Sequence, residues 1–255
     1  MRTRAASLIS LGLVLALSGC TTGGASQSPG PTIGPTGAAS QSVVATTTSA
    51  GTATTLGGGE VALDAGTYRL DLAAAPNIKE PGWPKLRITV PAGWTSLDGW
   101  ALHATEVGSP TVAVQFWDVS QVYGDPCNWS GTLFRPGSTV DDLVQALVAR
   151  TSRKATPPVN VTLDGFSGKY LEWSVPAAID FSTCDAVAGT HYFESWVGPS
   201  SESDRWQQGP GQVDRLWILD VNGHRVVIDA FEMPSTTAAQ RQELLDVVKS
   251  IKFER

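Results

Sequence analysis

The dipeptide Asn222-Gly223 constrains the fold of this chain more than any other feature of its sequence. It separates two apolar, β-branched-rich runs, Val213–Asp220 and Arg225–Met233. Asn-Gly tolerates the positive φ angles of a two-residue type I′ turn, so the pattern predicts a β-hairpin. We expect this hairpin to lie at the centre of a sheet. Nothing in it is a recognisable catalytic motif.

Short extended runs and two helical patterns surround the hairpin. Alternating apolar residues predict strands over residues 66–72, 85–90, 100–107, 111–119, 159–163, 168–175 and 191–197. Thr139 and Asp142 have capping-box spacing, which predicts a helix reaching Arg150. A second helix is expected over 235–250, before a last short run at 251–254. This order predicts an α+β fold, with an antiparallel β-sheet packed against helices.

The beginning of the chain predicts export. Arg2 and Arg4 precede an apolar run, Leu8–Leu17, that is too short to remain as a membrane span, so residues 1–19 are expected to be a signal peptide. The ending Leu17-Ser18-Gly19-Cys20 resembles the bacterial lipobox. That resemblance implies a lipoprotein whose Cys20 carries acyl chains such as palmitate. The alternative is an ordinary signal peptide with a cysteine beside its cleavage site.

The composition changes sharply at Glu60. Residues 20–59 are rich in Ser, Thr, Gly and Pro and contain no charged or aromatic residue. Such a segment cannot bury enough apolar surface to offset its ordering entropy, so we expect a disordered tether there. All nine Trp and all 24 acidic residues lie in residues 60–255, which are expected to form a single folded α+β domain.

The cysteine content fits an exported lipoprotein. Of three cysteines, Cys20 is assigned to lipid, which leaves Cys127 and Cys184 as an even pair in an oxidising compartment. A disulfide between them would stabilise the fold by about 4 kcal/mol through loop closure. The alternatives are two buried free thiols or a metal site. Neither cysteine belongs to a C-x-x-C pair, which argues against metal.

Charge and histidine content argue against several functions. Without Arg2 and Arg4, 16 Lys and Arg residues face 24 Asp and Glu residues, a net charge of about −8. Because no basic run is present, we expect no nucleic-acid partner. His103, His191 and His224 stand far apart, with no H-E-x-x-H helix or calcium loop, so neither a metal nor a cofactor is predicted.

Catalytic motifs are also missing from the sequence. There is no G-x-S-x-G elbow and no Ser-x-x-Lys motif, so no catalytic residue is predicted and we expect no enzyme. Glycoside hydrolysis would need two carboxyl groups at a set separation. The carboxylates in or beside strands are interpreted instead as the solvated face of the sheet. They are Glu172, Glu194, Asp220, Asp229 and Glu232.

The tryptophans are the one feature of the sequence that favours a binding function. An indole buries a large area and keeps one donor, so it suits protein interfaces, sugar faces and lipid pockets. Trp83, Trp129 and Trp206 occur in Gly-, Pro- or Asn-rich loops, where burial is not assured. With Arg205 and Gln207 they form the predicted contact surface.

Two segments resemble small exported domains of the PsbP and LpqN type. They are Val90-Pro91-Ala92-Gly93-Trp94 and the terminal Val248-Lys249-Ser250-Ile251-Lys252-Phe253. The resemblance implies an α/β/α sandwich, with an antiparallel sheet between helices. Three further runs, Gly209–Gln212, Asp214–Asp220 and Val227–Ala230, are similar to actinobacterial lipoproteins without an assigned activity. That similarity implies a non-enzymatic envelope module and transfers no catalytic residue.

These observations predict a lipid-anchored, non-catalytic envelope module that binds a protein partner or an amphiphilic ligand. It is expected at the outer face of the cytoplasmic membrane of a Gram-positive, actinobacterial cell, held there by its N-terminal lipid. A solute- or glycan-binding receptor lipoprotein is the alternative, and the small domain counts against a two-lobed receptor. A cell-wall hydrolase is opposed by the missing motifs.

Overall fold

The computed structural model describes residues 53–78, 80–106, 109–200 and 203–255. The predicted signal peptide, the lipidation site at Cys20 and the tether up to residue 52 lie outside these residues. Within them, no helix has the length and apolar character needed to cross a membrane.

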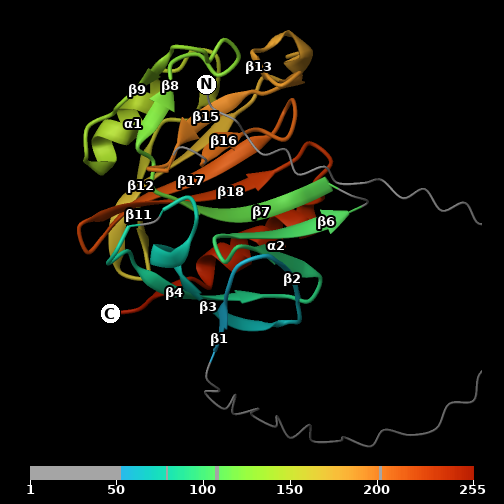
Figure 1. Cartoon of the computed structure of the whole chain (residues 1–255). Helices are drawn as coiled ribbons and strands as arrows, with labels where there is room; N and C mark the ends of the chain where they lie inside the picture. Colours follow the sequence, from blue (N-terminus) through green and yellow to red (C-terminus); the bar gives the residue numbers. More distant parts are fainter. Residues whose placement is uncertain (1–52, 79, 107–108, 201–202) are drawn as a thin grey trace, which may run out of the picture. The chain divides into compact units, whose positions relative to one another are not determined.

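A nine-stranded antiparallel sheet is the largest element of the fold, and its strands β12, β17, β18, β7 and β6 lie side by side in Figure 1. Its order is β10-β12-β17-β18-β7-β6-β5-β2, and β11 also pairs with β12. The bounds are β2 Glu60–Leu63, β5 Trp94–Leu97, β6 Ala101–Glu106, β7 Ser109–Trp117, β10 Lys154–Ala155, β11 Val159–Leu163, β12 Phe166–Ser174, β17 Val213–Val221 and β18 His224–Glu232.

The predicted hairpin is confirmed as the centre of this sheet. β17 and β18 pair along their whole length, from Val213 opposite Glu232 to Val221 opposite His224. The turn residues Asn222 and Gly223 both have positive φ, 55° and 86°, as a type I′ turn requires. β12 and β7 flank the hairpin on its two sides.

Two four-stranded sheets and one two-stranded sheet complete the β-structure that the described residues form. The first has the order β1-β3-β4-β19 and the second, called here the small sheet, has the order β16-β15-β8-β9. The bounds are β1 Thr54–Leu56, β3 Gly66–Asp71, β4 Lys85–Val90, β8 Gln121–Tyr123, β9 Leu133–Phe134, β13 Ala186–Val187, β14 Thr190–His191, β15 Glu194–Val197, β16 Asp204–Trp206 and β19 Lys252–Phe253. Two 3-10 turns cover Leu72–Ala74 and Phe181–Thr183.

Strand β1 corrects the predicted boundary of the tether. Thr54–Leu56 pair in parallel with Tyr68–Leu70 of β3, although their composition places them in the predicted tether. That composition excludes a buried core of their own. Backbone pairing along a sheet edge needs none, so composition carries no signal for this strand.

Both predicted helices are present and both begin at capping boxes. In α1, Val140–Val148, Thr139 accepts from the backbone N–H of Asp142, whose side chain bonds back to the backbone of Thr139. In α2, Ala238–Lys249, Thr237 and Gln240 make the same reciprocal pair. The predicted capping of α1 is therefore confirmed.

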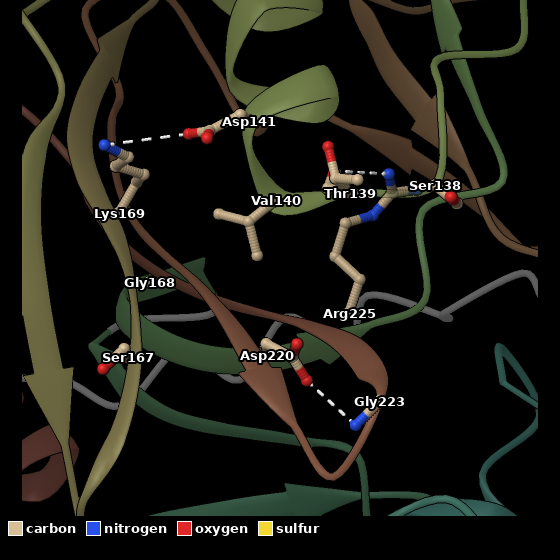
Figure 2. Close-up of a pocket in the computed structure, with 10 residues that line it drawn as sticks. All are labelled: Ser138, Thr139, Val140, Asp141, Ser167, Gly168, Lys169, Asp220, Gly223 and Arg225. Atoms are coloured by element: carbon tan, nitrogen blue, oxygen red, sulfur yellow. Dashed lines mark hydrogen bonds and ion pairs between the residues drawn. The ribbon is translucent and has the colours of Figure 1, made fainter.

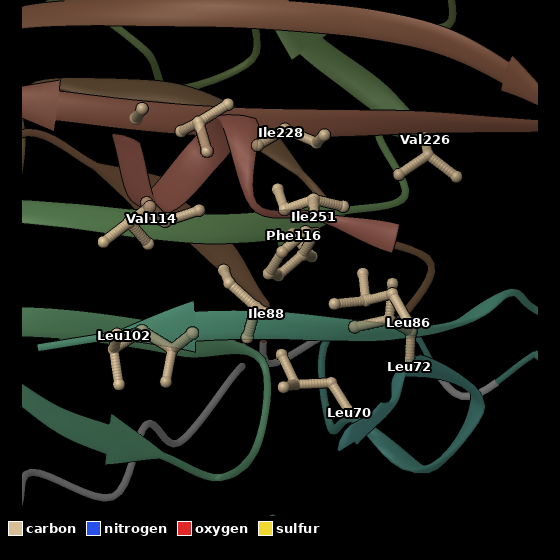
Figure 3. Packing of buried hydrophobic residues seen from close by; sticks show 14 of the residues in the cluster. Leu70, Leu72, Leu86, Ile88, Leu102, Val114, Phe116, Val226, Ile228 and Ile251 are labelled. Carbon is tan, nitrogen blue, oxygen red and sulfur yellow. The ribbon is translucent and has the colours of Figure 1, made fainter. Parts of the chain in front are cut away.

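The two helices cover opposite faces of the central hairpin. α2 packs against β7, β18 and β4, over a large apolar cluster that includes Phe116, Ile228 and Ile251 (Figure 3). α1 packs against β12, β17 and β10, over a second cluster that includes Leu216 and Val227. Because side chains alternate along a strand, Val227 and Ile228 enter different clusters.

Over the described residues, the α+β prediction is confirmed as a β-rich fold of mostly antiparallel sheets with two helices. The finer expectation of an α/β/α sandwich is not met clearly, because the smaller sheets and not only the helices cover the central strands. Sequence periodicity locates strands but does not show which of them leave the main sheet to form a separate layer.

The predicted disulfide is confirmed. Cys127 and Cys184 are bonded with their Cα atoms 4.4 Å apart, across 57 residues of sequence. Beside the bridge, the N–H of Asp185 donates to the carbonyl of Cys127 at 2.8 Å. The bridge packs with Val175 and Phe193 in a small third cluster.

Candidate functional site

Three of the five residues predicted for a contact surface have buried side chains. Trp83 belongs to the large apolar cluster, where its Nε1 donates to Glu80 Oε2 at 2.8 Å. Arg205 and Gln207 are each only 2% exposed. The predicted surface is therefore corrected for these three, because Trp83 packs into the large apolar cluster and the other two bond to residues of the main sheet or of the loop before it.

The other two, Trp129 and Trp206, are joined through Tyr192. Trp129 donates from Nε1 to the Tyr192 carbonyl at 3.1 Å, and its ring meets Tyr123 edge-on at 6.0 Å. The Tyr192 ring meets Trp206 edge-on at 5.8 Å. Trp206 is 42% exposed. We call Trp129, Tyr192 and Trp206 the aromatic strip. Tyr123, which supports Trp129, is buried at 4% exposure.

The loops that carry the aromatic strip are held by the disulfide region. Tyr192 donates its N–H to the carbonyl of Asp185 at 3.1 Å. The Asp185 carboxylate accepts from the N–H of Ser130 at 2.7 Å, beside Trp129. No sequence pattern singles out Tyr192, since its role depends on this loop contact between distant segments.

Behind Trp206 lies a set of four charged side chains that we call the buried ion cluster. Arg153 bonds Asp214 at 2.6 Å, and Arg205 bonds both Asp214, at 3.2 Å, and Asp229, at 2.7 Å. None of the four is more than 4% exposed. They come from the loop after α1, from β16, from β17 and from β18, so the cluster ties the small sheet to the main sheet.

Amide and hydroxyl groups extend the buried ion cluster. Gln212 donates to Asp214 Oδ1 at 2.6 Å and also to Gln207. Gln207 donates in turn to the hydroxyl of Ser195, which accepts from Arg153 at 2.9 Å. A closed network of this kind satisfies most of its polar atoms internally and defines one arrangement of the strands.

Indole rings cover one side of the network. The Arg153 guanidinium lies 3.7 Å from the centroid of the Trp173 ring, at cation–π distance. Trp196 stacks on Trp173 with centroids 6.0 Å apart. The Arg205 guanidinium also donates to the carbonyl of Trp206, so the cluster fixes the strand that presents the exposed indole.

Burial and neighbouring charges shift the pKa values of ionisable groups in the cluster. Burial raises the pKa of Asp229 to about 7, and the neighbouring Arg205 opposes that rise. Burial lowers the pKa of Arg153, although Asp214 beside it acts in the opposite direction. For Arg205, burial lowers the pKa, but the pull of Asp229 and Asp214 is larger and the pKa is raised.

The expected solvated face of carboxylates is wrong at three positions. Glu194, Asp229 and Glu232 are buried, whereas Asp220 is exposed and Glu172 is half-buried. Glu232 bonds Arg215 and Arg241 on the α2 side of the sheet. An alternating strand pattern predicts one solvated face, but on this hairpin each face is covered by other elements.

An open pocket of about 460 Å³ lies beside the turn of the hairpin (Figure 2). It shares no residue with the buried ion cluster. The start of α1, the first half of β12 and the β17–β18 turn enclose it. Its lining residues are Ser138, Thr139, Val140, Asp141, Ser167, Gly168, Lys169, Asp220, Gly223 and Arg225.

The described part of the chain contains no cluster of residues suited to binding a metal ion. No group of three or more His, Cys, Asp or Glu residues is placed there to hold a metal ion. His191 contacts the Cys184 carbonyl through Nδ1, and His224 packs against the ring of Trp83.

Neither a protein-family model nor a curated protein matches the chain. Its function must therefore be argued from its own residues.

Proposed function

We propose that this protein is a lipid-anchored, non-catalytic module of the cell envelope that binds a protein partner through the aromatic strip. The observation that carries the proposal is Trp206, a large indole 42% exposed beside Tyr192. Tryptophan and tyrosine supply much contact area with few rotatable bonds, and they dominate the energetics of protein interfaces.

The strip is suited to recognition because it is preorganised. The Cys127–Cys184 bridge holds its loops, and Arg205 fixes the backbone of Trp206 from behind. A rigid surface loses little conformational entropy when a partner binds. The pocket is lined mainly by polar residues, so it offers little support for an amphiphilic ligand.

The anchoring part of the proposal rests on the lipobox-like Leu17-Ser18-Gly19-Cys20 and on the long uncharged segment that follows. The PsbP/LpqN-type resemblance supports a non-enzymatic role, and a helix on each face of the central hairpin is compatible with its α/β/α layering. The Cys20→Ala variant should leave the membrane fraction. Membrane-bound Cys20→Ala protein would contradict lipid anchoring.

The partner-binding part is tested by chemical cross-linking in intact cells, followed by detection of this protein. Trp206→Ala should reduce a cross-linked complex of defined mass by at least ~10-fold, as expected when an interface anchor is truncated. Val159→Ala is the matched control, because Val159 is 54% exposed on the edge strand β11 and lies outside the strip. Equal cross-linking in all three proteins, or none in the wild type, would refute the proposal.

A further inference from the structure

We propose that the open pocket between α1, β12 and the β17–β18 turn binds a neutral polyhydroxylated molecule the size of one or two sugar rings. This site shares no residue with the aromatic strip, so it is a second function and does not depend on the first. Its volume of about 460 Å³ lies within the usual range for small-molecule sites.

The charged donors at the pocket are already engaged with the protein. Lys169 donates to Asn160 at 2.7 Å and lies 3.7 Å from Asp141. Arg225 directs its terminal nitrogens at backbone carbonyls, among them that of Thr139 at 3.1 Å and that of Val119 at 2.7 Å. A ligand carboxylate or phosphate would therefore have to break these bonds to gain a cation.

Acceptors, by contrast, remain available. In its bonds to described residues Asp220 uses only Oδ1, which accepts from the N–H of Gly223 at 2.9 Å. Asp141 is well exposed, and among the described residues its carboxylate makes only the long contact to Lys169. Within the part of the chain that the structure describes, the hydroxyls of Ser138 and Ser167 have no hydrogen-bond partner. A ligand that donates several hydrogen bonds would therefore complement these acceptors.

The charge at the pocket selects a neutral donor over a cationic one. The lining residues carry two carboxylates, Asp141 and Asp220, and two cations, Lys169 and Arg225, so an added ammonium group would gain little net attraction from them. Hydroxyl groups donate to carboxylates and also accept. The first-turn N–H groups of α1 that the capping box leaves without an acceptor, those of Val140 and Asp141, could bond to them.

Figure 2 shows the one apolar side chain of the lining, Val140, pointing into the space between these polar groups. Sugars present a C–H face beside their hydroxyls, which fits an apolar side chain surrounded by acceptors. The lining contains no aromatic ring on which a sugar could stack. We therefore expect weak binding that requires millimolar sugar.

Saturation-transfer NMR on the mature chain, purified in a detergent without a sugar head group, tests the proposal. The probes are glucose, maltose and glycine. Glucose or maltose should receive saturation from the wild type. In Asp141→Asn/Asp220→Asn the affinity should fall by at least ~10-fold, because hydrogen bonds to charged acceptors become bonds to neutral ones. The amide oxygen introduced at position 220 can still accept from Gly223, so the turn is preserved.

Asp180→Asn is the matched control. Asp180 is an exposed carboxylate outside the pocket that also accepts a backbone N–H, from Ser182 at 2.9 Å. The affinity of this variant for sugar should equal that of the wild type. Three results would overturn the proposal: no saturation of either sugar, equal sugar binding by the double variant, or saturation of glycine without sugar.

Discussion

The two faces of the β17–β18 hairpin differ in what holds them. Toward α2 the hairpin presents apolar side chains, among them Val226, Ile228 and Ala230, to one large cluster. Toward α1 its apolar side chains, such as Leu216 and Val227, lie in the middle of the strands, and the half farther from the turn carries Asp214 and Asp229 in the buried ion cluster. Burial of apolar surface is not directional, whereas ion pairs require one geometry. The α2 face is therefore stabilised mainly by apolar burial, with ion pairs of Glu232 at the end of its strand, whereas the fully buried ionic network on the α1 face also specifies a single arrangement.

The largest effect is expected at the centre of the ion cluster. Arg205→Met leaves Asp229 buried without its cation and should lower the free energy of unfolding by about 4 kcal/mol, measured by urea denaturation. Adding Asp229→Leu should restore much of that loss, because the orphaned charge is removed. Arg87→Met, at a side chain 55% exposed, should cost at most about 1 kcal/mol. An equally small cost for Arg205→Met would mean that the cluster does not hold the two sheets together.

A cavity on the opposite face should cost somewhat less. Ile228 is completely buried in the large cluster, so Ile228→Ala should lower the free energy of unfolding by about 3 kcal/mol. Ile228→Val removes one methylene and serves as the graded control, at about 1 kcal/mol. Because no charge is involved, neither loss should change between pH 5 and pH 8. A pH-dependent loss would show that the two faces are coupled.

The two faces should also differ in how their contribution to stability depends on pH. The pKa of Asp229 is raised by burial, from 3.8 to about 7. The folded state therefore binds a proton that the unfolded state has lost, and this contribution to stability is complete below pH 3.8 and disappears as the pH rises through about 7. In Asp229→Asn the decline in stability between pH 5 and pH 8 should become shallower. An unchanged slope in urea titrations across that range would assign the decline to other groups.

The smallest effects are expected at the helix caps, because the helices on the two faces begin with the same kind of capping box. Thr139→Ala and Thr237→Ala each remove a side-chain acceptor from a capping box, so each should cost about 1 kcal/mol. Thr→Ser at either position retains the hydroxyl and should cost far less. A much larger loss at Thr139 than at Thr237 would show that α1 depends on its cap and α2 on its packing.

Features that depend on neighbouring residues were predictable from the sequence. The Asn222-Gly223 turn and the Thr139–Asp142 cap are decided within a few residues, and both are confirmed. β11, Val159–Leu163, was predicted with its observed bounds. The cysteine pairing followed from counting, because only two cysteines remained once Cys20 was set aside.

The buried ion cluster was not predictable, because alternation assigns a residue to a face and not to a covering layer. The sequence pattern predicts a solvated Asp229 and an exposed Arg205, and both side chains are buried. Both predictions are wrong because β15 and β16 return over the hairpin as a separate sheet. The pocket escaped prediction for the same reason, since Asp141, Lys169 and Asp220 meet only through the packing of three distant segments.

The indole rings along the α1 side of the sheet are close enough together to couple optically. Trp100 lies 5.0 Å from Trp117, Trp117 lies 6.0 Å from Trp196, and Trp196 stacks on Trp173. At such separations excitation passes between rings, and their coupled transitions shape the near-ultraviolet circular dichroism. These four rings therefore act as a built-in optical reporter of how the small sheet is seated. Trp206, whose ring contacts Tyr192, reports separately on the solvent-facing surface.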